Sequence, residues 1–530
     1  MTSPPADQPD TTLIEHLCQQ RRARLVETHI SWVLLDGHDA WKIKKPLRLP
    51  FLDASTLALR QQLCEEELRL NQRLTPSIYL DVTPITGTPD APTLGGSGTV
   101  IDYAVHMRQF PDGALLCELV SADREQHPTQ SSTSPSPQPS RSLLPAQLDD
   151  FAQRLAAFHR QADIAPATSP YGSPELVERT TRDVLRNLAD IGSEALSAPF
   201  TAWLNAQVPL LRPIWAQRQS QGRIVEGHGD LHLANVVRLD GTLTAFDCIE
   251  FDPGLRWGDP LSDVAFLVMD LMAHQRTDLA YRFVNAYLDA SGDHAGLPVL
   301  RHYLVYRALV RALVARIKAG KGQAPAGPDY LALAHTLIAP VSPRLLITHG
   351  VSGSGKTYVT QGLMEHAGAI RLRSDVERKR LFGTASASPP ESDPAPLYSR
   401  DRTQATYAHL HDLARLSLQA GWPTIVDATF LDHDERKRFR HLAATQSAPF
   451  AILHCEAPRT TLEARLTARQ HAGKDASDAN VNVMAQQLQR DTAVHIEEAP
   501  YTLHTNTNQS DWAQQLTQQW LAMDTSANQQ

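Results

Sequence analysis

The 530-residue sequence predicts a multidomain protein in which an α+β part precedes an α/β part. The chain is longer than one hydrophobic core normally supports, and 42% of its residues are hydrophobic, enough for more than one core. Residues 344–357 join an apolar strand to a glycine-rich turn, a pattern typical of an α/β unit. The first half instead combines a hairpin signal with long helical segments, which favours an α+β arrangement.

A short proline-bearing connection at residues 339–343 separates the two parts. We expect halves divided near Val341 to fold independently. Residues 121–142, SADREQHPTQSSTSPSPQPSRS, are too polar and too rich in proline and serine to bury a core, so they predict a disordered insertion. The expected segments are 1–10 (disordered), 11–340 (first domain), 341–522 (second domain) and 523–530 (tail).

Composition argues against several classes of protein. The net charge of −8 and the pI near 6.3 give no overall basic surface, so a small-molecule partner is favoured over nucleic acid. The five cysteines are scattered, without metal or disulfide spacing, and predict reduced thiols in a cytoplasmic protein. The N-terminus lacks a basic segment followed by an apolar one, and the most apolar run, residues 264–269, stops at Asp270, so we expect no signal peptide or membrane span.

Near the N-terminus, two short apolar runs flank Asp36 and Gly37 and predict a β-hairpin. A lysine, Lys42 or Lys44, then stands on its second strand. Apolar residues at helical spacing predict a helix over residues 57–74, with Glu67 among its acidic positions. The other elements expected in this half are helices at 12–24, 148–162, 261–290 and 301–319 and strands around 236–237 and 243–246.

The edges of the last two strands carry a first set of candidate catalytic residues. Residues 228–235 read HGDLHLAN, and the following apolar run ends at Asp247. Asp230 and Asn235 are five positions apart, and Asp247 follows twelve later, which suits a catalytic loop and a strand pair that delivers a second carboxylate. In phosphoryl transfer the first aspartate takes the proton of the accepting hydroxyl, while the asparagine and second aspartate hold magnesium.

This segment resembles the HGDxxxxN loop of aminoglycoside phosphotransferase-like kinases, and residues 257–265, WGDPLSDVA, resemble the GDPxxDLA segment of that family. The resemblance implies a two-lobed protein-kinase-like fold in which Lys42 contacts ATP phosphates and Glu67 is its helix partner. Lys44 has the same strand parity as Lys42, and Glu66 adjoins Glu67, so both remain alternatives. No GxGxxG loop is present, and a small-molecule hydroxyl is favoured over a protein acceptor.

The turn at residues 350–357, GVSGSGKT, is typical of a Walker A P-loop that binds nucleotide. Its glycines can take backbone angles closed to other residues, so successive N–H groups can surround a phosphate at the start of the next helix. Lys356 adds positive charge and Thr357 an oxygen for magnesium. The expected nucleotide-binding residues are Gly350, Ser352, Gly353, Ser354, Gly355, Lys356 and Thr357.

A strand expected at 369–373 leads into a second set of candidate residues. Ser374 and Glu377 have the spacing of a helix capping box, an architectural reading. Asp375 and Arg378 share one face of the first helical turn at the carboxyl end of the strand, where α/β sheets bind ligands, so they can also serve as base and anion-binding cation. Both readings can hold together.

Three further residues are candidates. Asp427 ends an apolar strand and could bind magnesium or acceptor, or could cap a helix. Arg465 and Arg469 lie at i, i+4, so one helix could direct both toward a transferred phosphate, although a solvated face gives the same pattern. With the P-loop, these segments resemble the zeta-toxin/polynucleotide-kinase-like branch of P-loop kinases. That resemblance implies roles for Asp375 as acceptor base, Arg378 as acceptor or phosphate ligand, and Arg465 or Arg469 as a lid residue.

The two halves together resemble bacterial bifunctional proteins that join a phosphotransferase-like domain to a P-loop ATP-binding domain. We therefore expect an ATP- and Mg²⁺-dependent kinase with one small-molecule hydroxyl acceptor and a second acceptor that is a small alcohol or a nucleic-acid hydroxyl. The alternative is a nucleotide-binding regulatory protein in which one or both domains do not turn over an acceptor. The sequence leaves the oligomeric state open.

Overall fold

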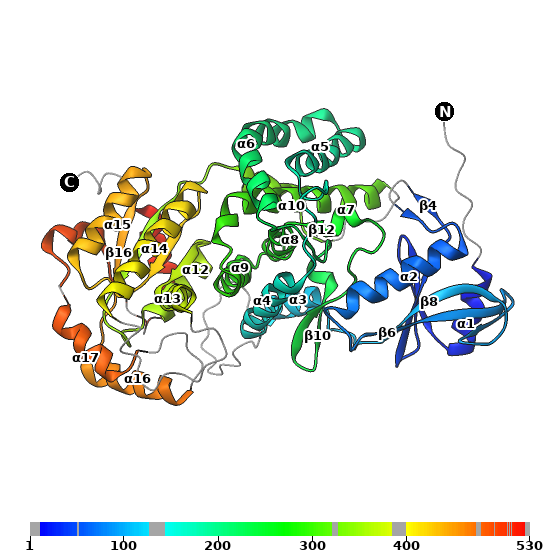
Figure 1. Cartoon of the computed structure of the whole chain (residues 1–530), viewed down its shortest axis with the longest axis horizontal. Helices are drawn as coiled ribbons and strands as arrows, with labels where there is room; N and C mark the ends of the chain where they lie inside the picture. Colours follow the sequence, from blue (N-terminus) through cyan, green and yellow to red (C-terminus); the bar gives the residue numbers. More distant parts are fainter. Residues whose placement is uncertain are drawn as a thin grey trace. The chain divides into compact units, whose positions relative to one another are not determined.

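The computed structural model describes residues 11–49, 52–126, 144–320, 327–383, 399–472, 479–491, 493–505, 507, 509 and 511–524 (Figure 1). The segment expected to be disordered at 1–10, positions 127–142 of the expected insertion and residues 525–530 of the expected tail lie outside these residues. The chain forms two compact units, Met1–Thr180 with Trp215–Asp270, and Thr181–Ile214 with Leu271–Gln530. This division does not coincide with the expected border near residue 340.

The first unit contains a six-stranded antiparallel sheet in the order β1-β2-β3-β8-β6-β7. Its strands are β1 (Arg24–Glu27), β2 (Ser31–Leu35), β3 (Asp39–Lys44), β6 (Tyr79–Thr88), β7 (Ala91–Leu94) and β8 (Val100–Arg108). Gly37 has φ of 95° in the β2–β3 turn, which confirms the predicted hairpin and explains the glycine. Helix α2 (Leu57–Gln72) packs against β6 and β8, and α1 is Thr12–Arg21.

The rest of the first unit carries the HGD loop between short strands. β9 (Val225–Glu226) pairs with β12 (Trp257–Gly258), and β10 (Val236–Leu239) forms a hairpin with β11 (Thr242–Ala245). The strands expected near 236–237 and 243–246 are therefore confirmed. The remaining elements are the 18-residue helix α4 (Leu144–Gln161) and the short β4 (Arg48–Leu49), β5 (Leu52–Asp53), η1 (Leu233–Asn235) and α7 (Pro253–Arg256).

Two expectations for residues 11–340 are wrong. The start of the expected disordered insertion is helical, because α3 runs over Leu116–Gln126 and begins in the apolar segment before it. The helix expected over 261–290 is two helices, α8 (Pro260–Ala273) and α9 (Thr277–Ser291), and Gln275 between them has φ of 64°, which no α-helix accommodates. The other long helices are α5 (Pro174–Ile191), α6 (Glu194–Ser220), α10 (Leu297–Gly320) and α11 (Tyr330–Ile338), with the short η2 at His294–Gly296.

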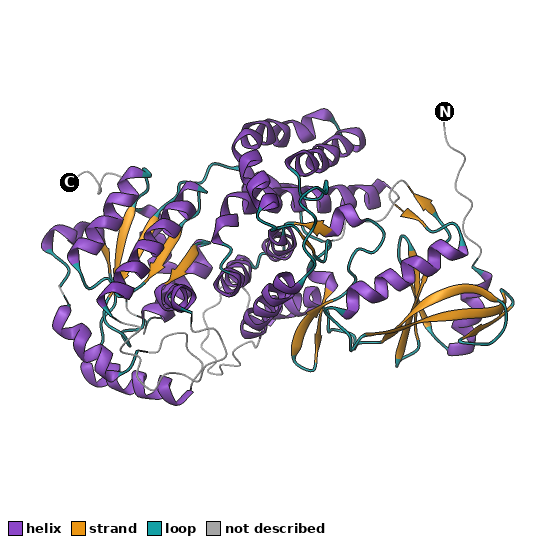
Figure 2. Cartoon of the chain, viewed as in Figure 1, coloured by secondary structure: helices purple, strands orange, loops and turns teal. Residues whose placement is uncertain are grey.

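The second unit contains a five-stranded parallel sheet in the order β14-β15-β13-β16-β17 (Figure 2). Every residue of β13 and β15 is buried, as expected for a parallel sheet covered on both faces. Its strands are β13 (Leu345–His349), β14 (Ile370–Arg373), β15 (Thr424–Asp427), β16 (Phe450–His454) and β17 (Thr502–Leu503). The α/β fold predicted for this half is thus confirmed.

Helices surround this sheet. One apolar core joins α12 and α18 to the sheet through residues such as Leu346, Leu363 and Trp520, all at most 1% exposed, while α14 and α15 contact strands of the same sheet. The helices are α12 (Lys356–Ala367), α13 (Ser374–Phe382), α14 (Arg400–Gln419), α15 (His433–Thr445), α16 (Arg459–Ala472), α17 (Val481–Arg490), η4 (Ile496–Tyr501) and α18 (Trp512–Ala522).

Helix α9 covers the free edge of this sheet, although it ends about 60 residues before the P-loop. The buried Asn285 side chain accepts a hydrogen bond from the Arg371 N–H at 2.7 Å and donates one to the Ala369 carbonyl at 2.9 Å, so it takes the place of a neighbouring strand beside β14. Trp422 Nε1 donates to the Leu297 carbonyl of α10 at 3.1 Å. A fragment beginning near Val341 would lack both helices.

Candidate active sites

The HGD loop places Asp230 and Asn235 side by side. Asn235 Nδ2 donates to the Asp230 carboxylate at 3.0 Å and to its backbone carbonyl at 2.9 Å. The Phe246 N–H donates to the Asn235 carbonyl at 3.0 Å, which ties the loop to the strand end that carries Asp247. His232 Nε2 lies 3.4 Å from the Asp230 carboxylate. The three residues proposed from spacing thus come from one hydrogen-bonded loop and hairpin.

A buried carboxylate holds this loop in place. Asp263, at the start of α8, accepts hydrogen bonds from the N–H groups of His228 at 2.7 Å and Gly229 at 2.9 Å, and its other neighbour is His159 at 3.3 Å. Burial favours a raised pKa for Asp263, but His159 and these bonds outweigh burial and lower the pKa to about 2. Gly229 has φ of 86°, a conformation that favours glycine in the bend before Asp230.

Lysines of β3 connect the sheet to the strand end. Lys42 Nζ lies 2.7 Å from Glu67 Oε1 and 2.5 Å from Asp247 Oδ1. Lys44 forms ion pairs with Glu67 and with Glu250. The structure therefore separates the two candidates left open by the sequence: Lys42 faces Asp247, the carboxylate proposed for magnesium, and Lys44 faces Glu250. Glu66 instead pairs with Arg69 and Arg256, outside this cluster.

The charges in this cluster stabilise one another. Burial opposes charge on Glu67, yet Lys42 and Lys44 more than offset burial and lower the pKa of this carboxyl. Burial likewise disfavours a charged Lys42, but Asp247 and Glu67 raise its pKa well above the usual value. The lysine is therefore a fixed cation at neutral pH, as a phosphate-binding residue must be.

In the second unit, the P-loop has the backbone of a phosphate cradle. Gly350, Gly353 and Gly355 have φ of 139°, 88° and 98°. A Cβ added to Gly350 would lie 2.2 Å from the Cys455 carbonyl, so this position excludes any side chain. Lys356 is buried and its Nζ donates to the Val351 carbonyl at 2.9 Å. Burial lowers the pKa of Lys356, an effect that Asp427 partly offsets.

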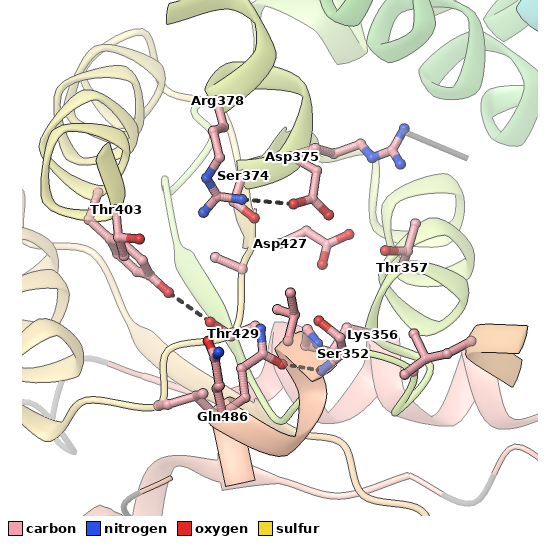
Figure 3. Close-up of a pocket in the computed structure, with 18 of the residues that line it drawn as sticks. Ser352, Lys356, Thr357, Ser374, Asp375, Arg378, Thr403, Asp427, Thr429 and Gln486 are labelled. Atoms are coloured by element: carbon pink, nitrogen blue, oxygen red, sulfur yellow. Dashed lines mark hydrogen bonds and ion pairs between the residues drawn. The ribbon is translucent and has the colours of Figure 1, made fainter. Parts of the chain in front are cut away.

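Asp375 and Arg378 face the P-loop across one cavity of about 870 Å³. Arg378 Nη1 donates to Asp375 Oδ1 at 2.9 Å, and Figure 3 shows the carboxylates of Asp375 and Asp427 projecting into the space bordered by Thr357 and Lys356. Asp427 also accepts a hydrogen bond from Thr360 Oγ1 at 3.1 Å. The structure therefore brings together the candidates that the sequence placed on three separate strand ends.

The capping box expected at Ser374 is absent from α13. The helix begins at Ser374 itself with Arg373 as N-cap, and no side chain caps it. Glu377 turns instead toward Arg380 and His409, and His409 Nε2 lies 3.0 Å from its carboxylate. Burial would raise the pKa of Glu377, but the bonds to His409 and Arg380 lower it to about 2. The capping box predicted from Ser374 and Glu377 is therefore wrong.

The proposed lid arginines both line the cavity. Arg465 Nη1 donates to the Gly353 carbonyl at 3.2 Å, so it contacts the P-loop, and Arg469 Nη2 donates to the Ala479 carbonyl at 2.6 Å. Helix α17 adds Gln487, whose Oε1 accepts the Ser352 N–H at 2.8 Å.

Sequence reasoning missed the part of the cavity wall that α14 and α15 form. Helix α14 contributes Arg400, Thr403 and Tyr407, and the start of α15 contributes Asp432 and Glu435. Tyr407 Oη lies 3.2 Å from Thr429 Oγ1 and accepts the Phe430 N–H at 2.9 Å, which fixes it on the cavity wall. These residues follow ordinary amphipathic helix patterns, so no local signal distinguishes them from a solvated helix face.

The two folds and their sites define a protein that joins two kinase-type domains. The Phosphotransferase enzyme family matches residues 115–303, and the AAA domain matches residues 345–493. These ranges confirm the resemblance of the two halves. The first range begins after Lys42 and Glu67, so the assignment of that pair rests on geometry.

An uncharacterized protein of Mycobacterium bovis and one of Mycobacterium tuberculosis are each 30% identical to the chain over 487 residues, which is 89% of this chain and 92% of the relative. The similarity extends through both halves. The chain belongs to this family of fused phosphotransferase and P-loop proteins.

Among solved structures, glucosamine kinase in complex with glucosamine, ADP and inorganic phosphate is 13% identical and covers 62% of this chain and 83% of its own, with a TM-score of 0.34. A gluconokinase from Sinorhizobium meliloti 1021 is 17% identical and covers 34% of this chain and 91% of its own, with a TM-score of 0.25. Within the described ranges, none of the helices has the length and apolar character needed to cross a membrane.

Proposed function

We propose that the chain is an ATP- and Mg²⁺-dependent phosphotransferase with two sites, each transferring the γ-phosphate of ATP to a hydroxyl. The first site acts on a small molecule, and the second acts on a small alcohol or a nucleic-acid hydroxyl. One observation carries the proposal: a single cavity holds the P-loop lysine together with the Asp375–Arg378 pair, so phosphate-binding and acceptor-binding groups face the same space. A site that only bound nucleotide would not need the Asp375–Arg378 pair.

The residues of the P-loop fit a bound nucleotide. Gly350, Gly353 and Gly355 have the positive φ angles that a phosphate-binding loop requires, and the Ser354 hydroxyl is buried without a hydrogen bond among the described residues. Thr357 and Asp427 supply the hard oxygen ligands that magnesium prefers. When bound, MgATP supplies the phosphoryl group, and a nucleoside diphosphate is the leaving group.

In the second site, Asp375 would accept the proton of the attacking hydroxyl as the new oxygen–phosphorus bond forms and the bond to the leaving nucleotide breaks. Arg378, held by Asp375 at 2.9 Å, would bind the acceptor or the transferred phosphoryl oxygens. Arg465 and Arg469 reach the cavity from α16 and would neutralise charge developing on those oxygens. Lys356 would contact the phosphates from the helix start.

In the first site, Asp230 would take the proton of the acceptor hydroxyl, and Asn235 keeps that carboxylate oriented through its amide hydrogen bond at 3.0 Å. Asn235 and Asp247 would hold magnesium. Lys42 would contact the nucleotide phosphates from β3, with Glu67 directing it. The two sites differ in fold, so they would accept different substrates.

Variants of each site test the proposal. Purified Asp230→Asn and Lys356→Ala proteins would be incubated with γ-labelled ATP and a metabolite extract. The exposed residues Asp240 and Lys437 offer matched controls, Asp240→Asn and Lys437→Ala. We expect two labelled products in the wild type and both controls, with one product lost in each site variant.

Other outcomes contradict this expectation. Nucleotide binding at both sites without any labelled product would support the regulatory alternative. Loss of both products in Lys356→Ala alone would assign all catalysis to the second site, and identification of each product would name its acceptor.

A further inference from the structure

Two histidines and a glutamate from different segments meet on the surface of the second unit. His433 begins α15, and His495 and Glu497 flank the start of η4, about 60 residues later. Their nitrogen and carboxylate ligand atoms all lie within 4.8 Å of one another. The imidazole rings of His433 and His495 are stacked with centroids 4.0 Å apart. This trio lies apart from the nucleotide-binding residues described above.

The spacing of these atoms suits a tetrahedral metal ion. Zinc bonds of about 2.1 Å to nitrogen and oxygen place neighbouring ligand atoms about 3.4 Å apart. His433 Nε2 and Glu497 Oε1 are 3.5 Å apart, so this pair already spans one edge of such a tetrahedron. His495 is exposed, and rotation of its side chain can close the remaining distance. A fourth position stays open to water.

A buried ion pair fixes the backbone of the trio. Arg436, one turn after His433 and fully buried, donates to both oxygens of Glu498, at 2.9 and 2.8 Å, and to the Ala493 carbonyl at 3.2 Å. Glu498 in turn accepts the His495 N–H at 2.8 Å. The planar guanidinium therefore holds the segment before η4 against α15 in one register, and the ligand positions do not depend on two mobile loops.

The same glutamate lies beside one of the histidines, just beyond hydrogen-bond distance. Glu498 Oε1 lies 3.6 Å from His433 Nδ1, while His433 Nε2 faces Glu497. Metal-binding histidines characteristically direct their second ring nitrogen to a carboxylate, which fixes the ring and strengthens the ligand. The two carboxylates account for the contacts of the His433 ring, but they give no reason for a second imidazole stacked beside it.

We propose that His433, His495 and Glu497 bind a zinc ion that joins the start of α15 to η4. Two imidazoles and one carboxylate favour zinc over magnesium or calcium, which prefer oxygen ligands alone. Asp432 and Glu435, on either side of His433, line the large cavity. The ion would therefore stabilise the part of the cavity wall that the start of α15 forms, without contacting the nucleotide.

Metal binding to the untagged full-length protein tests this site, because a polyhistidine tag would itself bind zinc. Chelator-treated wild type, His433→Ala, His495→Ala and Glu497→Gln would be titrated with Zn²⁺ against a chromophoric competitor in excess Mg²⁺. His441→Ala, an exposed histidine on the same helix, is the matched control. We expect one more tightly bound zinc in the wild type and control than in the His433→Ala and His495→Ala variants, and at least tenfold weaker binding in Glu497→Gln.

Two further measurements separate binding from misfolding. Co²⁺ should give a tetrahedral visible spectrum in the wild type and control that disappears in both histidine variants. Zinc should raise the thermal unfolding midpoint only where this site is intact, while all five proteins should show the same circular dichroism without metal. Equal stoichiometry and spectra in His441→Ala and His495→Ala, or absence of tight zinc binding in the wild type, would overturn the proposal.

Discussion

Asn285 gives the sharpest test of how the two family regions depend on each other. This residue lies on α9, inside the range matched by the Phosphotransferase enzyme family, yet its side chain bonds the edge strand β14 of the P-loop sheet. Asn285→Ala would remove the partner of the Arg371 N–H, at 2.7 Å, and of the Ala369 carbonyl, at 2.9 Å. Both groups would then lie beneath α9 without these bonds.

The magnitude follows from those two groups. A buried polar group that loses its partner costs about 1–3 kcal/mol, which gives about 2–6 kcal/mol for the two groups, and we expect Asn285→Ala to destabilise the second unit by an amount in the lower half of this range, about 2–4 kcal/mol. Asn285→Asp should cost at least as much, because a carboxylate accepts from Arg371 but faces the carbonyls of Ala369 and Tyr281, which the amide now contacts as a donor at 2.9 and 2.8 Å. The exposed Asn205 offers a control, Asn205→Ala, expected to change stability by less than about 0.5 kcal/mol.

Urea denaturation and hydrogen exchange followed by mass spectrometry measure this effect. If β14 exchanges through local opening, a loss of about 2–4 kcal/mol speeds exchange of its peptide by roughly 30- to 1,000-fold, whereas the peptide of the central strand β13 should change less. Unchanged exchange in β14 together with an unchanged urea midpoint would refute the reasoning. It would mean that α9 does not support the P-loop sheet through this residue.

The remaining predictions concern charges in the first unit. Lys44→Met should destabilise the protein by about 3–5 kcal/mol, because it leaves the buried Glu250 unpaired. Lys42→Met should cost less stability, since Asp247 is 40% exposed, but should abolish phosphoryl transfer at the first site; urea denaturation and product analysis would detect a reversed pattern. Asp263, with its pKa lowered from 3.8 to about 2, should contribute about 2 kcal/mol above pH 4 that is lost as the pH falls toward 2. The stability difference between wild type and Asp263→Asn should therefore shrink over that range, and a constant difference would contradict it.

Local patterns predicted much of this protein. The β2–β3 hairpin, the P-loop and the HGD loop were all visible in the sequence because their backbone geometry depends on a few neighbouring residues, above all on glycines with positive φ such as Gly37 and Gly229. The choice between Lys42 and Lys44 could not be made from the sequence. Both point to the same face of β3, and only the fold brings Asp247 to one and Glu250 to the other.

The sequence by itself thus determined the two kinase-type folds and the residues on their glycine-rich turns, because those signals are local. Only the tertiary structure shows which residues from distant parts of the chain contact one another. It placed the Arg400 and Glu435 side chains on the wall of the cavity, and it brought Asn285 against the edge strand of a sheet that begins about 60 residues later. The periodicity of a helical sequence shows which face of the helix is polar, but not which residues that face contacts. Contacts between segments distant in the sequence leave no periodic signal along the chain.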